Sequence, residues 1–278
     1  MEKVKGYFKI MRPVTSFSGA LAILLGGYVA RTGAWFEIIL ATVIGFLLAG
    51  AANAWNDYRD IEIDRINQPQ RALPAGMINL QEANWFALIL NAVAILLSLA
   101  ISGPAVLMTL AFTLILYVYS WRLKSTVLLG NCTIALVSAM TVIFGGVAAG
   151  NPRPTLWLAV IIWVAILGRE VLKTIADYEG DLGQQCRTIA TVWGKSRARL
   201  VFYGVMVVSV MAMMLPHWLQ LYRPVYAYIV ILGVFPVLAY VLWRVRGDSS
   251  GRQLENLSQL LKYDFFVWFI AVILGAAR

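Results

Sequence analysis

Long apolar segments alternate with short polar segments along the whole chain. Nine of the apolar segments have the length and composition of helices that cross a lipid bilayer. They span residues 14–30, 36–55, 84–102, 104–120, 127–149, 154–172, 200–215, 224–243 and 263–277. The pattern therefore predicts an all-α membrane protein with nine transmembrane helices.

Composition supports this prediction. Hydrophobic residues make up 60% of the 278 residues and charged residues 13%, which is about half of the roughly 25% found in soluble domains. Cys132 and Cys186 lack the spacing of a zinc site, and His217 is the only histidine. Neither thiolate nor histidine chemistry is indicated.

The basic residues predict the orientation in the membrane. All but four of the 23 Lys and Arg residues lie in polar segments on the same side as the N-terminus; the exceptions are Arg31, Arg153, Arg223 and Arg278. By the positive-inside rule, we expect a cytoplasmic N-terminus and an outside C-terminus in the cytoplasmic membrane. The net charge of +9 then reflects topology and attraction to anionic membrane lipids, and no nucleic acid is expected as a partner.

A cluster of polar side chains follows the second apolar segment. Asn56, Asp57, Asp60 and Asp64 lie on one helix face if the helix continues through them. Carboxylates at the end of a membrane helix need pairing, water or a bound cation. Oxygen ligands in this number suit Mg²⁺, and the nearby Arg65 and Arg71 suit phosphate oxygens. The alternative is an acidic helix end that continues into a solvated loop.

A second acidic cluster follows the sixth apolar segment. Asp177 and Asp181 repeat the four-residue spacing of the first cluster, and Lys173 lies one helical turn before Asp177. Each cluster is followed by a loop and an arginine. This repetition indicates one membrane domain with two similar halves, at about 1–125 and 126–278.

Three further polar positions stand at cytoplasmic helix ends. Tyr119 and Lys124 end the fourth apolar segment, and Arg12 precedes the first. Interfacial tyrosines and arginines ordinarily serve only as membrane anchors, and that alternative stays open for all three.

The last three apolar segments contain one acidic residue, Asp264, which falls near the start of the ninth. The stretch from Arg244 to Lys262 is expected to be a polar loop, with a short helix on the membrane surface as the alternative.

Both acidic motifs resemble the signatures of the UbiA superfamily of intramembrane prenyltransferases. The first signature is similar to Asn56-Asp57-x-x-Asp60-x-x-x-Asp64 with Asn67-x-Pro69-x-Arg71-x-x-Pro74-x-Gly76. The second is similar to Arg169-Glu170-x-x-Lys173-x-x-x-Asp177-x-Glu179-Gly180-Asp181. The second motif looks closest to geranylgeranylglyceryl-phosphate prenyltransferases and chlorophyll synthases, from which the chain departs at Thr174 and Ala190.

The resemblance implies nine helices around a central cavity and a role in isoprenoid biosynthesis. The implied reaction is Mg²⁺-dependent transfer of a polyprenyl group from polyprenyl diphosphate to a lipophilic acceptor, either an aromatic ring or a prenylated glycerol phosphate. The expected metal ligands are Asn56, Asp57, Asp60 and Asp64 for one ion, and Asp177 and Asp181 for another. The expected diphosphate ligands are Arg12, Arg71, Lys124 and Lys173. Tyr119 would face the allylic cation or orient the diphosphate.

A cation-coupled membrane transporter is the rival hypothesis, because carboxylates within membranes also line ion paths. Against it, the acidic residues gather at one membrane side together with Lys and Arg, which repel a passing cation. The outer halves of the segments carry no matching charge.

Overall fold

The computed structural model describes residues 2–183, 185–246 and 249–277. Arg278, expected outside the membrane, is not among the described residues. Those that are described form helices and no strand, and nine of the helical segments are long and apolar enough to cross a membrane. The prediction of an all-α fold with nine membrane helices is confirmed.

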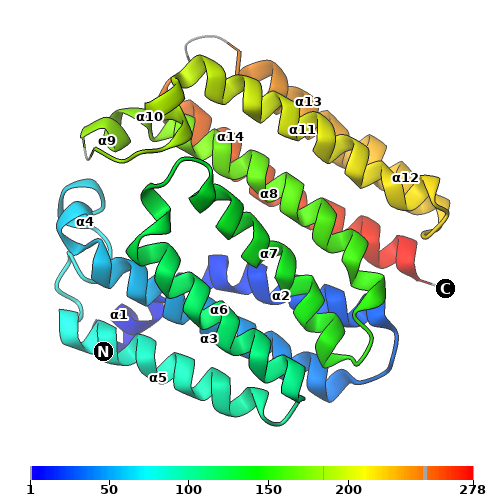
Figure 1. Cartoon of the computed structure of the whole chain (residues 1–278), viewed down its shortest axis with the longest axis horizontal. Helices are drawn as coiled ribbons and strands as arrows, with labels where there is room; N and C mark the ends of the chain where they lie inside the picture. The colour runs from blue at the N-terminus through cyan, green and yellow to red at the C-terminus, as the bar shows by residue number, and fades with distance from the viewer. Residues whose placement is uncertain (1, 184, 247–248, 278) are drawn as a thin grey trace. The chain divides into compact units, whose positions relative to one another are not determined.

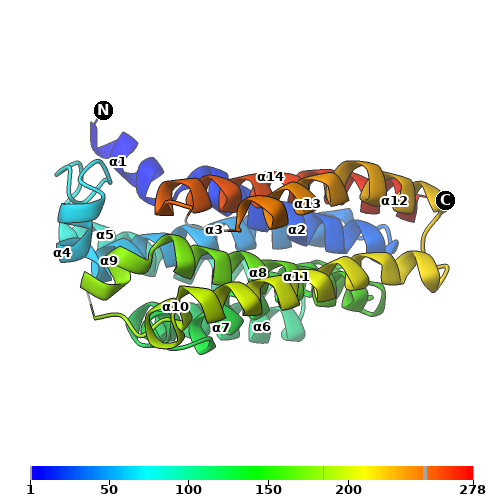
Figure 2. The same ribbon diagram turned by 90° about the horizontal axis from the view of Figure 1, so that it is seen from above.

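Short helices precede the first of the nine membrane segments and lie in some of the connections between them (Figures 1 and 2). The membrane segments are α2 (Pro13–Ala30), α3 (Trp35–Arg59), α5 (Leu80–Ser98), α6 (Gly103–Trp121), α7 (Leu129–Ala148), α8 (Leu156–Ala176), α11 (Lys195–Trp218), α12–α13 (Pro224–Ile229 and Phe235–Arg244) and α14 (Gly251–Ala276). The short helices are α1 (Glu2–Ile10), α4 (Ile61–Asn67), η1 (Leu123–Ser125), η2 (Arg153–Thr155), α9 (Tyr178–Gly183) and α10 (Ile189–Trp193).

The expected loop between Arg244 and Lys262 is wrong. The last helix begins at Gly251 rather than near residue 263, so Asp264 lies in the middle of α14. The first three turns of α14 contain many polar residues. A search for long apolar segments therefore does not include these turns in the helix. The start is fixed by a capping box, in which the Ser250 side chain accepts from the Gln253 N–H and the Gln253 side chain accepts from the Ser250 N–H.

The eighth membrane segment is not a uniform α-helix. A π-helical turn, η3 (Val230–Val234), separates α12 from α13. Pro236 follows directly in the first turn of α13. Since proline has no N–H and its ring clashes with the preceding turn, a local change in the hydrogen-bond ladder is expected here.

The chain forms two compact units, which are described separately. Unit 1 comprises Met1–Leu123 and Met140–Leu156, and unit 2 comprises Lys124–Ala139 and Trp157–Arg278. In unit 1, α3 packs against α2, α5 and α6. The α2–α7 contact needs glycine, because a Cβ at Gly145 would lie 1.9 Å from the Ile23 carbonyl oxygen.

In unit 2, α14 packs against α12, η3 and α13 (Figures 1 and 2). A buried chain of hydrogen bonds joins three helices: Trp268 Nε1 donates to the Tyr226 hydroxyl over 3.2 Å, and that hydroxyl donates to the Met213 carbonyl over 2.6 Å. The polar groups of Trp268 and Tyr226 thereby find partners inside the apolar bundle.

Candidate active site

The first acidic cluster is built on a small break in a helix. α3 ends at Arg59, Asp60 has φ −96° and ψ 9°, and α4 begins at Ile61. The helical ladder nevertheless continues, because the Asp60 N–H donates to Asn56 O over 2.9 Å and the Asp64 N–H donates to Asp60 O over 2.8 Å. The carboxylates therefore keep their helical spacing.

The second cluster repeats this local design in unit 2. α8 ends at Ala176, Asp177 lies between the helices, and α9 carries Asp181 in its first turn. The Asp177 N–H donates to Lys173 O over 2.9 Å, and the Asp181 N–H donates to Asp177 O over 2.8 Å. In both clusters, one aspartate stands at the break and another lies four residues later.

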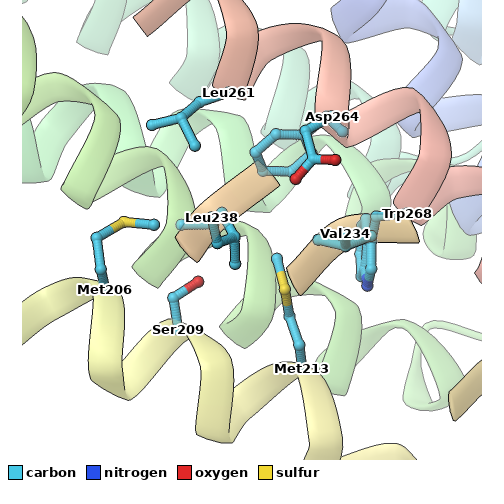
Figure 3. Close-up of a pocket in the computed structure, with 10 residues that line it drawn as sticks. Met206, Ser209, Met213, Val234, Leu238, Leu261, Asp264 and Trp268 are labelled. Carbon is cyan, nitrogen blue, oxygen red and sulfur yellow. The ribbon is translucent and has the colours of Figure 1, made fainter. Parts of the chain in front are cut away.

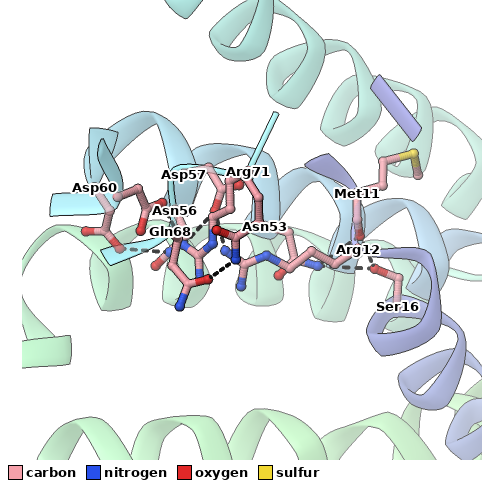
Figure 4. A network of polar contacts seen from close by, with 11 residues as sticks. Met11, Arg12, Ser16, Asn53, Asn56, Asp57, Asp60, Gln68 and Arg71 are labelled. Carbon is pink, nitrogen blue, oxygen red and sulfur yellow. Dashed lines mark hydrogen bonds and ion pairs between the residues drawn. The ribbon is translucent and has the colours of Figure 1, made fainter. Parts of the chain in front are cut away.

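Asp57 is the most deeply buried acid of the first cluster, with 2% exposure. Its Oδ1 accepts from Arg12 Nη2 and from Arg71 Nη1, the latter over 3.4 Å (Figure 4). The same Arg71 nitrogen donates to Asp64 Oδ2 over 2.6 Å. Two arginines thus neutralise the buried carboxylates, so the loop residue Arg71 also has a structural role.

Two asparagines complete the first cluster. Asn56 Nδ2 donates to Asp60 Oδ2 over 2.9 Å, which holds the carboxylate at the helix break. Asn53, which sequence reasoning missed, donates to the Met11 carbonyl over 3.0 Å (Figure 4). This bond fixes the chain beside Arg12, whose backbone adopts the left-handed conformation (φ 49°) just before Pro13. Such strain persists where surrounding contacts enforce it.

A cavity of about 300 Å³ opens beside these arginines in unit 1. It is lined by Lys9, Arg12, Asp57, Gln70, Arg71 and Ala72. Three of these side chains are cationic and one is acidic, so the cavity suits an anion with oxygen acceptors. Sequence reasoning did not single out Lys9 or Gln70, because the wall joins segments that are far apart in the chain.

Ion pairs also fix the basic side chains of the second cluster. Lys173 Nζ lies 3.2 Å from Glu170 Oε2, and Arg169 Nη1 lies 3.1 Å from Glu170 Oε1. Arg169 Nε also donates to the Ser258 carbonyl on α14 over 3.2 Å. The polar start of α14 therefore lies beside the second cluster. The sequence-based expectation of a loop at this position did not predict this contact.

The carboxylates of the second cluster lie where negative charge is unfavourable. Burial raises the pKa of Asp181 to about 6, and the charge of Asp177 adds to this effect, while a hydrogen bond from Thr188 opposes it. Burial also raises the pKa of Asp177, against the opposing charges of Lys173 and Lys124. A cation that bound between these aspartates would remove the penalty.

Each cluster therefore offers a pair of carboxylates. Among the described residues, no three Asp, Glu, His or Cys side chains are grouped so that they could hold a metal ion. Mg²⁺ is usually bound by one or two carboxylates, with substrate phosphates and water as its other ligands. The donor set fits an ion that is bound together with a diphosphate.

The remaining candidate residues lie at the end of the fourth membrane segment. Tyr119 is in the last turn of α6, in unit 1, and Lys124 is in η1, in unit 2. Unit 1 brings together Arg12, Asp57, Asp64 and Arg71, with Asn56 and Asp60 beside them. In unit 2, Lys124 and Lys173 act electrostatically on Asp177 and Asp181.

Comparison with known proteins places this architecture in context. The sequence profile of the UbiA prenyltransferase family matches residues 20–270. A digeranylgeranylglyceryl phosphate synthase from Thermococcus gammatolerans is 31% identical over 278 residues, which cover 99% of each chain.

Two solved structures are also similar. One, described as digeranylgeranylglyceryl phosphate synthase in membranes, has a TM-score of 0.81 and 28% identity, with 99% of both chains covered. A UbiA homologue from Archaeoglobus fulgidus, bound to GPP and Mg²⁺, has a TM-score of 0.68 and 18% identity, with 95% of this chain and 99% of that one covered. The latter similarity concerns the fold alone.

Proposed function

Because this chain belongs to the UbiA prenyltransferase family and is an integral membrane enzyme, we propose that its acceptor is a prenylated glycerol phosphate and its donor a polyprenyl diphosphate. The observation that carries the proposed chemistry is the repeated aspartate pair, placed identically at two helix breaks. The names of the relatives support the choice of acceptor. The family does not support the rival transporter hypothesis.

The proposed metal sites follow from the donor sets. Asn56, Asp60 and Asp64 hold one Mg²⁺, with Asp57 beside them as a ligand or as the acid that positions Arg12 and Arg71. A second Mg²⁺ is held by Asp177 and Asp181. When bound, Mg²⁺ supplies Lewis-acid neutralisation of the charge that develops on the diphosphate.

The basic side chains hold the diphosphate in this proposal. Arg71 and Arg12 present guanidinium groups to the cavity of unit 1, and Lys124 and Lys173 supply fixed positive charge in unit 2. Arg71 and Asp64 neutralise each other before the substrate binds. Asp64 would hold the cation, and Arg71, which Asp57 also holds in place, would donate hydrogen bonds to phosphate oxygens.

The proposed transfer exchanges one C–O bond for another. The bond between C1 of the prenyl group and the diphosphate oxygen breaks, and its electron pair leaves with the diphosphate. A hydroxyl oxygen of the acceptor bonds to C1, and the hydroxyl proton passes to solvent or to the released diphosphate. Tyr119 stabilises the allylic cation with its ring face. The apolar helices exclude water, which would otherwise capture the cation.

The proposed orientation puts both clusters on the cytoplasmic side, where a water-soluble diphosphate is released. The N-terminus is then cytoplasmic and the C-terminus lies outside, as the distribution of Lys and Arg predicts.

An acceptor panel tests the choice of substrate. Purified protein is incubated with Mg²⁺, labelled geranylgeranyl diphosphate and one of three acceptors: geranylgeranylglyceryl phosphate, its dephosphorylated form, or 4-hydroxybenzoate. We expect a lipid product with the first acceptor, far less with the second and none with the third. Efficient prenylation of the aromatic acceptor alone would overturn the acceptor assignment.

A further inference from the structure

Asp264 is a buried acid that the proposed reaction does not use. It lies in the middle of α14, within a membrane segment, with 6% exposure. Its Oδ1 has no hydrogen-bond partner among the described residues. A buried polar atom in such a place needs a partner, since burial without one is costly.

The carboxyl group lines a small cavity in unit 2 (Figure 3). α8, α11, η3, α13 and α14 contribute side chains to its wall, and its volume is about 20 Å³. A cavity above about 10–15 Å³ can hold one water molecule. The Ser209 hydroxyl, on α11, lines the same cavity, is fully buried and also has no described partner. Two orphan polar groups therefore border a space for one small occupant.

The chemistry of the wall discriminates between a cation and a neutral occupant. None of the described residues that line the cavity carries a positive charge. Besides the two polar groups, the wall includes the thioethers of Met206 and Met213 and the ring of Trp268. Thioethers are soft ligands that do not suit Na⁺, K⁺ or Mg²⁺. An ionised carboxylate at this membrane depth would have no positive charge in the wall to balance it. A neutral carboxylic acid needs no such counter-charge.

The backbone beside the cavity is irregular in the same place. Val234, the last residue of the π-helical turn η3, lines the cavity. π-helical turns are frequent at functional sites and where a side chain or water interrupts the regular ladder. Pro236 already accounts for this turn, so the cavity and the two orphan groups alone indicate an occupant.

We propose that this cavity binds one water molecule between a protonated Asp264 and Ser209, and so joins α14 to α11. The acid O–H donates to the water oxygen, and the water donates to the Ser209 hydroxyl oxygen. A bound water of this kind satisfies both orphan groups without a charge in the membrane. It also explains an acid in the last helix that belongs to neither metal cluster.

Infrared difference spectroscopy of the full-length protein in lipid nanodiscs tests the protonation state. The wild-type minus Asp264→Asn difference should contain the carbonyl stretch of a protonated carboxylic acid. Asp57→Asn is the control, because Asp57 is also buried but is paired with arginines; its difference should show carboxylate bands. Carboxylate bands for Asp264 as well would overturn the proposal.

A double-substitution experiment tests the shared water. Ser209→Ala should lower the melting temperature by about 2–4 °C in the wild-type background. In the Asp264→Leu background it should have no further effect, because the bridge is already absent. Equal losses in both backgrounds would contradict a shared water. A melting temperature that rises with Na⁺ or K⁺ in the wild type, but not in Asp264→Asn, would show a cation site instead.

Discussion

Arg71 Nη1 lies 2.6 Å from Asp64 Oδ2, so a proposed phosphate ligand and a proposed metal ligand neutralise each other. The same nitrogen reaches Asp57 Oδ1 at 3.4 Å. Arg71 is therefore held in place before any substrate arrives. Preorganised positive charge of this kind stabilises a developing negative charge without reorganisation.

Substitution of Arg71 should weaken binding of the donor. Arg71→Ala should lower the affinity for a non-hydrolysable prenyl diphosphate analogue by about 1.5–3 kcal/mol, roughly 10- to 150-fold, because a charged hydrogen bond is lost. Arg71→Lys should lose less, since lysine keeps the charge but cannot form two parallel bonds. Binding in detergent is measured by calorimetry.

Arg65→Ala is the matched control for Arg71. Arg65 lies six residues earlier, is 61% exposed and pairs with Glu62. The Arg65→Ala variant should bind the donor as tightly as the wild type. Equal losses for Arg65→Ala and Arg71→Ala would indicate a general effect of surface charge.

Substitution of Asp57 should destabilise the protein. Asp57→Asn leaves two arginines without their buried acid, which for buried pairs costs about 3–5 kcal/mol. We expect the free energy of unfolding to fall by about 3 kcal/mol, the lower end of this range, because the side chains of Arg12 and Arg71 are 32% and 28% exposed. Thermal unfolding should show a fall of roughly 6–12 °C. Glu62→Gln, at a site with 78% exposure, should leave the melting temperature unchanged; a fall of the same size would contradict the assignment.

Substitution of the second aspartate in either cluster should abolish turnover. Asp64→Asn and Asp181→Asn each remove a charged ligand, and the rate should fall at least about 100-fold. Matched controls are Glu62→Gln and Glu179→Gln, since both glutamates are exposed and pair with neighbouring basic residues. Either aspartate variant that kept near wild-type turnover at low Mg²⁺ would argue against two metal sites.

The positions of both aspartate pairs were predictable from the sequence. Spacing of four residues survives the helix breaks because backbone hydrogen bonds bridge Asp60 and Asp177. The bonds from Arg71 were not predictable, since a loop can return to a helix in many ways. Hydropathy likewise missed the start of α14, although Ser250 and Gln253 carry a capping signal that could have found it.

Topology provides an independent prediction. In a background without Cys132 and Cys186, Gln70→Cys should react with a membrane-impermeant maleimide only from the cytoplasmic side, and Arg153→Cys only from the outside. Both positions are exposed, so lack of reaction would reflect sidedness rather than burial. Labelling of both positions from one side would contradict the proposed orientation.

The most direct test measures two products of one reaction. Purified protein is supplied with geranylgeranyl diphosphate, labelled in both the prenyl group and the diphosphate, and with geranylgeranylglyceryl phosphate. We predict equal amounts of prenylated lipid and released diphosphate in the presence of Mg²⁺, and neither product after chelation. Prenylated lipid formed at an undiminished rate in excess chelator, or diphosphate released without any transfer to lipid, would contradict metal-dependent prenyl transfer at the two aspartate pairs.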